Sequence, residues 1–256
     1  HHMWVPTTGD TRLIAVELAG LPQIGSEGQG DAAINYAYTF DNADVACHGV
    51  GRVALLTAWL RSPAQFETTY AMEAFIDELA AAANQDPLSV RLKYLGDQRA
   101  IEVLRAAADL YGWESRPSPN KGQDGKLAKG RGVAWVNRDD SRVATIADVT
   151  VDRDSGEIRV KRVVVAHDCG LVVNPDGLKN QIEGNVIQSL SRTLHEEVAF
   201  DNAHVTSRDW EGYPILRFEE IPDRIDIVLV NNRPEYPSYG GGEPSTCPTA
   251  AVISNA

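Results

Sequence analysis

The pattern of apolar and polar residues divides the chain into a helical part and a later β-rich part. Residues 4–67 hold much glycine, asparagine, aspartate and threonine around short β-prone stretches such as 34–38, which predicts irregular strands and loops. From Thr68 apolar residues recur at helical spacing and predict a helix with its acidic residues facing outward. Its buried stripe would be Tyr70, Ala71, Ala74, Phe75, Ile76 and Leu79, and its outer face Glu73, Asp77 and Glu78.

Two further helices are predicted before residue 113. Asp86 followed by Pro87 is typical of an N-cap and a first helical residue, so a second helix begins there. Apolar spacing predicts a third helix over 98–111 that stops at Gly112. We expect the three helices to form a scaffold, which together with the preceding segment makes a first unit at residues 4–113.

Beyond a linker at residues 114–130, which contains several prolines and glycines, the pattern changes to β-prone runs. A polar turn containing Gly156 predicts that the second and third of these strands pair as a hairpin. A final helix is expected from Thr249, so residues 130–256 would form a second, β-rich unit. The predicted fold class is α+β, with helices packed on a mixed sheet. The predicted strands are 133–136, 143–151, 158–166 and 225–230.

A helix over residues 177–193, capped by Asn174 before Pro175, is predicted to have two different faces. A stripe of amides ending in a cation can hydrogen-bond a polar heteroaromatic ligand. The ordinary alternative is a solvated helix face, and the pattern alone favours that alternative. The buried seam would be Leu178, Ile182, Val186 and Leu190, and the amide stripe Gln181, Asn185, Gln188 and Arg192.

Three consecutive glycines precede a single carboxylate, Glu243, which Pro244 follows. Glycines permit backbone conformations closed to other residues and let a ligand approach the amides closely. Exposed N–H groups suit an anionic or oxygen-rich ligand, and a carboxylate beside them can act as a general base. The alternative is a flexible surface loop with a solvated glutamate.

The composition argues against several kinds of partner and site. The 256 residues carry a formal net charge of −12, which disfavours nucleic acid and anionic membrane surfaces as partners. No apolar run approaches the roughly 20 residues of a membrane-spanning helix. The three cysteines are far apart, and we expect reduced, mostly buried thiols and no protein-held metal site. His1-His2-Met3 resembles a tag remnant, and the localisation stays open between bacterial cytoplasm and periplasm.

Four segments resemble the large, molybdopterin-binding chain of the xanthine dehydrogenase and aldehyde oxidase superfamily, and within it the group of isoquinoline oxidoreductase beta subunits. Their order and spacing are more specific than any one of them, and together they cover about residues 50–256. The segments are Trp59-Leu60-Arg61-Ser62-Pro63-Ala64-Gln65 with the helix at 71–80, His167-Asp168-Cys169-Gly170 through Asn174-Pro175, Gln181-Ile182-Glu183-Gly184, and Gly240-Gly241-Gly242-Glu243-Pro244.

The resemblance implies roles for individual residues. Glu243 matches the family's catalytic base, which deprotonates the hydroxide held by molybdenum. Gln181 matches a glutamine that hydrogen-bonds the metal's oxo ligand or the pterin. Two further residues match a segment that lines the metal site from the opposite side, and two match backbone that passes close to the cofactor. These are Arg61 and Ser62, and Gly241 and Gly242, respectively.

The resemblance also implies a molybdenum hydroxylase that adds a water-derived oxygen to an N-heteroaromatic compound or an aldehyde. Its cofactor would be molybdenum-molybdopterin, with the cytosine dinucleotide form as one option, and electrons would pass to iron–sulfur clusters on a [2Fe-2S] small subunit. Family large subunits are longer and carry a glycine-phenylalanine-glycine loop that this sequence lacks. We therefore expect part of a large subunit, inactive in isolation, whose first half lies on the same or a separate chain. The alternative is a non-catalytic scaffold or assembly module.

Overall fold

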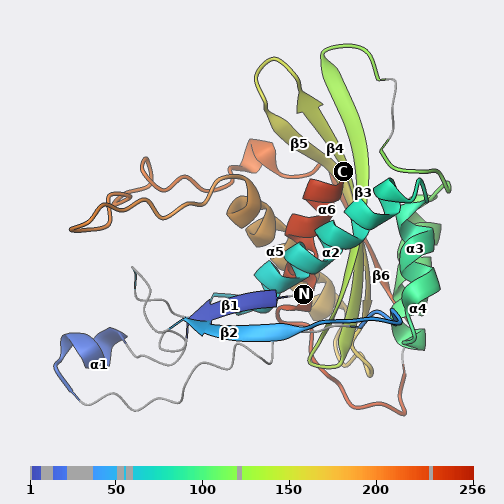
Figure 1. Ribbon diagram of the computed structural model, residues 1–256. Helices are drawn as coiled ribbons and strands as arrows, with labels where there is room; N and C mark the ends of the chain where they lie inside the picture. The colour runs from blue at the N-terminus through green and yellow to red at the C-terminus, as the bar shows by residue number, and fades with distance from the viewer. Residues whose placement is uncertain are drawn as a thin grey trace.

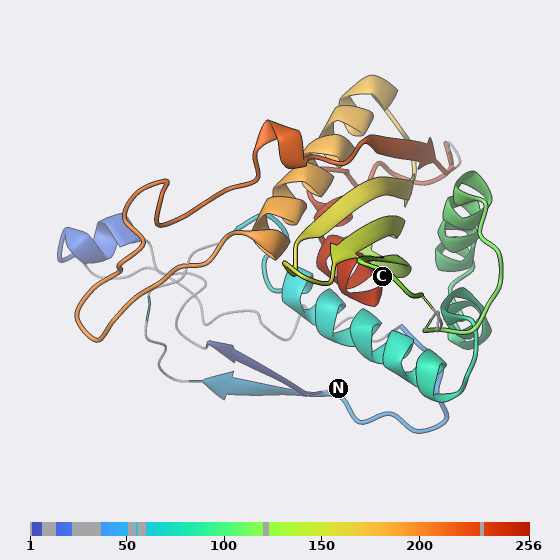
Figure 2. The same ribbon diagram turned by 90° about the horizontal axis from the view of Figure 1, so that it is seen from above.

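The computed structural model describes residues 2–6, 14–21, 37–50, 55, 60–119, 123–230 and 233–256. Most of them belong to one α+β body in which helices lie on both sides of a twisted sheet, as Figures 1 and 2 show. The predicted fold class is confirmed. Trp59 and the β-prone stretch at 34–36 lie outside the described residues.

The sheet contains four strands in the order β3-β4-β5-β6. The first three are antiparallel neighbours, and β6 runs parallel to β5, so the sheet is mixed as predicted. The expected hairpin of β4 and β5 is present, and Gly156 in its turn has a φ of 76°. The strands are β3 (Leu127–Arg138), β4 (Ser141–Asp152), β5 (Ile158–Asp168) and β6 (Arg224–Leu229).

The main helices begin and end close to their predicted bounds. The side chain of Asp86 accepts a hydrogen bond from the Ser89 N–H at 2.8 Å, and that of Asn174 accepts one from the Gly177 N–H at 2.9 Å. The helices are α2 (Gln65–Ala82), α3 (Pro87–Tyr94), α4 (Gln98–Tyr111), α5 (Pro175–Leu194) and α6 (Thr249–Asn255), with 3₁₀ turns η2 (Phe218–Glu220) and η3 (Pro244–Thr246).

Alternate side chains of β3, β4 and β5 point to opposite faces of the sheet, so two hydrophobic cores form. One core joins α2, α3 and α4 to residues such as Trp135 and Ile146. The other joins α5 and α6 to residues such as Val136 and Val165. The predicted seam of α5 lies in this second core, with Ile182 fully buried. The division at residues 4–113 and 130–256 stays a prediction, although side chains from both parts meet in the first core.

The described N-terminal residues form a small sheet of their own. The strands β1 (His2–Pro6) and β2 (Ala46–Val50) pair in parallel, and α1 (Ile14–Leu18) is a short helix. β1 includes His2 and Met3, which resemble a tag.

All three cysteines are free, and two of them, Cys169 and Cys247, are buried. Among the described residues, no helix combines the length and apolarity needed to cross a membrane.

The predicted faces of α2 are wrong at most positions. Glu73 and Asp77 are only 1% and 8% exposed, whereas Phe75 is 55% exposed and Tyr70 also lies at the surface. The reason is Arg91 of α3, which is completely buried and pairs with Glu73 at 2.8 Å and with Asp77 at 2.7 Å. Apolar periodicity could not reveal these long-range partners.

The buried cluster around Arg91 neutralises the charges that it takes out of water. Burial by itself lowers the pKa of Arg91, but the negative charges of Glu73 and Asp77 outweigh burial and raise it above its ordinary value. The Glu73 carboxylate also accepts hydrogen bonds from the Tyr38 hydroxyl at 2.6 Å and from the backbone N–H of Trp135 at 3.1 Å. The cluster therefore ties α2 and α3 to the edge of the sheet.

Replacing Arg91 by methionine should lower the free energy of unfolding by about 3–5 kcal/mol, because two buried carboxylates lose their cation. Urea unfolding of the chain measures this loss. Lys161→Met is the control, since Lys161 and Asp223 form an exposed ion pair and its loss should change stability little. Equal stability of the two variants would contradict the importance of the buried cluster.

Candidate functional site

Four segments that are far apart in the sequence meet beside the glycine loop, residues 240–243. They are the stretch 61–65 leading into α2, the turn 138–141 between β3 and β4, the amide stripe of α5, and the loop itself, which leads into η3. All six residues that the sequence analysis assigned to the site lie in three of these segments. The turn 138–141 was not predicted to take part.

The glycine loop is held by its carbonyl oxygens. Each of the four consecutive carbonyls accepts a hydrogen bond from a side chain outside the loop. Because the donors come from three different segments, the backbone of the loop has a defined position despite its glycines. The bonds run from Ser141 Oγ to Gly240 O (2.8 Å), from Asn185 Nδ2 to Gly241 O (3.4 Å), from Arg61 Nε to Gly242 O (2.8 Å) and from Ser62 Oγ to Glu243 O (2.7 Å).

The backbone N–H groups of the loop, in contrast to its carbonyls, are available to a ligand. In the described part of the chain, the N–H groups of residues 240–243 donate no hydrogen bond to another protein group. A Cβ atom at Gly242 would meet no atom within 4 Å, whereas one at Gly241 would lie 2.1 Å from Leu178 Cδ1. The loop therefore packs tightly against α5 at Gly241 and is open at Gly242.

The Glu243 carboxylate is held at both oxygens. Its Oε2 accepts a hydrogen bond from the Ser62 backbone N–H at 2.7 Å. Its Oε1 accepts from Arg138, at 2.9 Å from Nε and at a second contact from Nη2. The Glu243 side chain is 32% exposed, so it is accessible from one side. No motif around Arg138 indicated this contact, because the residue is a lone arginine at the end of a strand.

The amide stripe of α5 converges on Arg61. The Gln181 Oε1 atom accepts from Arg61 Nη2 at 2.5 Å, and the Gln188 Oε1 atom accepts from Nη1 at 3.3 Å. From the C-terminal end of the stripe, Arg192 Nη1 donates to the Arg61 carbonyl at 2.7 Å. Asn185, which bonds Gly241, completes the stripe. The amide stripe predicted on α5 therefore contacts Arg61, which the family resemblance also implied to line the site.

The segment that presents Arg61 and Ser62 has an unusual backbone. Ser62 and Ala64, on either side of Pro63, have φ values of 62° and 58°. Residues other than glycine rarely adopt this conformation, and each instance costs on the order of 1–3 kcal/mol. The two Ser62–Glu243 hydrogen bonds and the packing of α2 maintain it. The conformation directs the Ser62 N–H toward the carboxylate.

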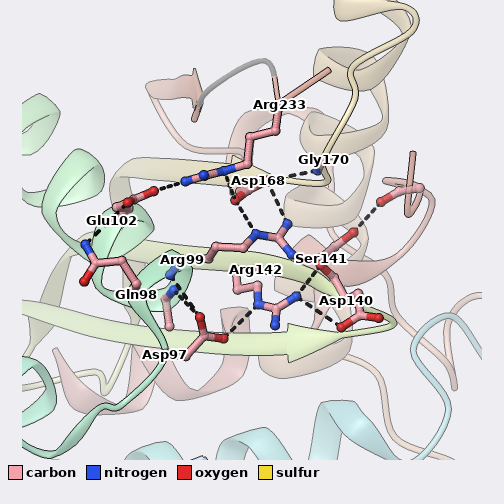
Figure 3. Close-up of polar contacts among 12 residues, drawn as sticks. Asp97, Gln98, Arg99, Glu102, Asp140, Ser141, Arg142, Asp168, Gly170 and Arg233 are labelled. Atoms are coloured by element: carbon pink, nitrogen blue, oxygen red, sulfur yellow. Dashed lines mark hydrogen bonds and ion pairs between the residues drawn. The ribbon is translucent and has the colours of Figure 1, made fainter. Parts of the chain in front are cut away.

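Asp168 anchors the chain that leads into the glycine loop. Figure 3 shows Arg99 and Arg233 on either side of its buried carboxylate, with Arg233 also paired to Glu102. Arg99 donates to both Asp168 oxygens at 2.8 Å. Burial opposes ionisation of Asp168, but the hydrogen bonds from Arg99 and Gly170 keep its pKa below the usual range. Because Arg233 precedes the loop by seven residues, this network anchors the segment that leads to the loop.

The glycine loop also covers a buried histidine. His167 is fully buried, and its Nδ1 atom lies 3.0 Å from the Ser245 hydroxyl oxygen. Burial lowers the pKa of His167 to about 4, against smaller opposing contributions from Asp168 and the Gly240 backbone. The imidazole is therefore neutral at pH 7 and acts as a packing residue beneath the loop.

Residues 76–222 match the molybdopterin cofactor-binding domain family. The chain is 43% identical over 208 residues to one of the subunits of nicotinate dehydrogenase from Pseudomonas putida, covering 78% of this chain. It is 30% identical over 173 residues to the beta subunit of isoquinoline 1-oxidoreductase from Brevundimonas diminuta, covering 67% of this chain. The matches span only 17% and 21% of these relatives' lengths.

Among solved structures, the aldehyde oxidoreductase from Desulfovibrio desulfuricans is similar over 98% of this chain and 43% of its own, with a TM-score of 0.71 and 14% identity. The aldehyde oxidoreductase from Desulfovibrio gigas is similar over 89% of this chain and 42% of its own, with a TM-score of 0.64 and 15% identity. At these identities the likeness concerns the fold alone.

The low pKa of His167 predicts a specific loss of stability in acid. An unfolded histidine takes up a proton near pH 6.5, whereas the folded one resists protonation until about pH 4. The unfolded state therefore binds more protons between these values, and the free energy of unfolding should fall by about 3 kcal/mol as the pH drops from 7 to 4. Urea unfolding at several pH values measures this change.

The control for this prediction is His167→Gln, which cannot take up the proton. The fall in stability between pH 6.5 and 4 should be about 3 kcal/mol smaller in the variant than in the unchanged chain, because the carboxylates contribute equally to both. Parallel pH dependences in the two proteins would show that His167 does not resist protonation.

Proposed function

The chain belongs to the molybdopterin cofactor-binding family, and on that premise we propose that it forms one wall of the active site of a molybdenum hydroxylase, with Glu243 as the base. The observation that carries this proposal is the meeting of the Glu243 carboxylate, the Arg61–Gln181 pair and the open backbone of the glycine loop. Because the chain spans about a fifth of its relatives' length, the activity of the whole protein is part of the proposal.

The residues present fit such a cofactor. A pterin with a phosphate group and a metal with oxygen ligands offers many hydrogen-bond acceptors, which require donors on the protein. The unpaired N–H groups of residues 240–243, the open face at Gly242 and the Arg61 guanidinium supply donors on one side of the site. We propose that Gln181, Arg61, Ser62, Gly241 and Gly242 hold the cofactor.

When bound, the cofactor supplies the two-electron redox chemistry and the activated oxygen. This chain's own part is to position a carboxylate and remove a proton. The Ser62 N–H orients Glu243, and the partial burial of the side chain limits competition from water. Because the loop carbonyls are bonded to side-chain donors, the N–H groups of the loop would be the backbone groups that hold the cofactor.

The substrate class that we propose is an N-heteroaromatic compound. Nicotinate dehydrogenase and isoquinoline 1-oxidoreductase, two relatives with at least 30% identity over two thirds of the chain, are named for such compounds. We also propose that the remainder of the large subunit closes the other side of the site, and that electrons leave through a [2Fe-2S] small subunit.

In the complete complex, Glu243→Gln should lower kcat by about 10²–10⁴-fold, because glutamine cannot take up the proton. Molybdenum and pterin content should stay unchanged, as measured by elemental analysis and by the fluorescence of the released pterin. Glu183→Gln, on the exposed side of α5, is the matched control and should keep full activity. Full activity of the Glu243 variant would exclude the proposed base and favour a non-catalytic scaffold.

Arg61→Met should reduce cofactor retention by at least about tenfold, because the variant loses the bonds to Gly242, Gln181 and Gln188 together. Molybdenum per complex after gel filtration measures retention. Arg105→Met, at an exposed position of α4, serves as the control. Stoichiometric molybdenum in the Arg61 variant would argue against the proposed cofactor-facing role.

A further inference from the structure

We propose that Arg138 is a positioning residue for the Glu243 carboxylate, which it holds so that only the Oε2 atom is free to accept a proton. This inference rests on the proposed role of Glu243 as the base. Neither the family match nor any motif in the sequence draws attention to Arg138.

The contacts at the carboxylate determine which oxygen can accept a proton. An ionised carboxylate offers about two acceptor sites on each oxygen. Two N–H groups of Arg138, at Nε and Nη2, occupy Oε1, and the Ser62 N–H occupies one site on Oε2. One acceptor site on Oε2 is left over. Arg138 therefore blocks one oxygen and directs proton transfer to the other.

Arg138 is itself held in place by neighbouring groups. Its Nη1 atom donates to Gln65 Oε1 at 2.8 Å, and Gln65 Nε2 donates to the Asn137 carbonyl at 2.8 Å. Gln65 is 5% exposed and lies in the first turn of α2, directly after the strained segment that presents Ser62. The two groups that hold the carboxylate, the Ser62 N–H and the Arg138 guanidinium, are thus connected through the start of α2.

The backbone of the β3–β4 turn contributes to the same arrangement. Arg138 and Ser141 pair across the hairpin, and the two residues between them, Asp139 and Asp140, have φ values of 49° and 61°. Positive φ at both positions is the geometry of a tight two-residue turn that suits the twist of the strands. From this turn Ser141 bonds the Gly240 carbonyl while Arg138 bonds the carboxylate of Glu243. One turn therefore holds both ends of the glycine loop.

A second carboxylate lies near Arg138 but competes weakly. Asp139 Oδ2 is 3.6 Å from Arg138 Nε, and the Asp139 side chain is 73% exposed. Water and salt weaken an exposed ion pair more than one that is partly shielded. Glu243, at 2.9 Å and with 32% exposure, is the principal partner of Arg138.

The decisive experiment compares variants of the complete complex. In Arg138→Ala, kcat should fall by about 10²-fold because the base is no longer held in its reactive geometry, while KM and molybdenum and pterin content stay unchanged. Added guanidinium ion should restore part of the lost activity in this variant and have no such effect on the unaltered enzyme. Arg138→Lys should recover little, because an ammonium group cannot present two parallel N–H groups to one oxygen.

Two further variants separate positioning from general stabilisation. Asp139→Asn keeps the turn, since asparagine tolerates positive φ, and should retain full activity. Adding Arg138→Ala to Glu243→Gln should cause no further loss of kcat, because residues that act as one unit are not additive. In ¹⁵N spectra of the chain, the Arg138 Nε–H signal should shift more in Glu243→Gln than in Asp139→Asn, because Glu243 is the closer partner.

The results distinguish failure of this inference from failure of the proposed function. Full kcat in Arg138→Ala, with Glu243→Gln inactive, would overturn the role of Arg138 and leave the base in place. A loss of activity that follows a loss of molybdenum and that guanidinium does not restore would show that Arg138 only stabilises the fold. Full activity of Glu243→Gln would remove the proposed function on which the inference rests.

Discussion

The backbone of residues 240–243 is fixed through its carbonyl oxygens, and the candidate site depends on this constraint. A run of glycines left to itself samples many conformations, and ordering it costs entropy. Side chains of Ser141, Asn185, Arg61 and Ser62 each bond one carbonyl in turn. With the carbonyls occupied, the N–H groups remain as the polar face that an oxygen-rich ligand can use. The same bonds bring the Glu243 carboxylate beside Ser62.

The side chains that bond the loop carbonyls have fixed positions because the elements that carry them are packed in the two cores. The apolar seam of α5, with Ile182 and Val186 fully buried, fixes the position of the helix. It thereby places Asn185 against the loop and Gln181 against Arg61. The buried Arg91 cluster ties α2 to α3 and β3, and so positions the stretch 61–65 that leads into α2. The Asp168 network holds the approach to the loop from the other end. Polar networks of this kind specify one arrangement because each member is satisfied only there.

Much of this could be predicted from sequence where the signal is local. The caps at Asp86 and Asn174 and the seam of α5 depend on neighbours within a few residues, and the structure contains them. The faces of α2 were wrong at most positions because two of its acidic residues pair with a buried arginine on another helix. Arg138 escaped prediction because its partner is 105 positions away and a lone strand-end arginine carries no pattern. The six residues implied by family resemblance lie together, but their roles remain proposals.

The most direct measurement is an experimental structure of the complete complex with its cofactor bound. The cofactor should lie against the open face at Gly242, with loop N–H groups and Arg61 within hydrogen-bond distance of its oxygens and the Glu243 carboxylate directed at the metal. A cofactor bound elsewhere, with packed side chains between it and Glu243, would contradict the assignment of this loop as the wall of the active site.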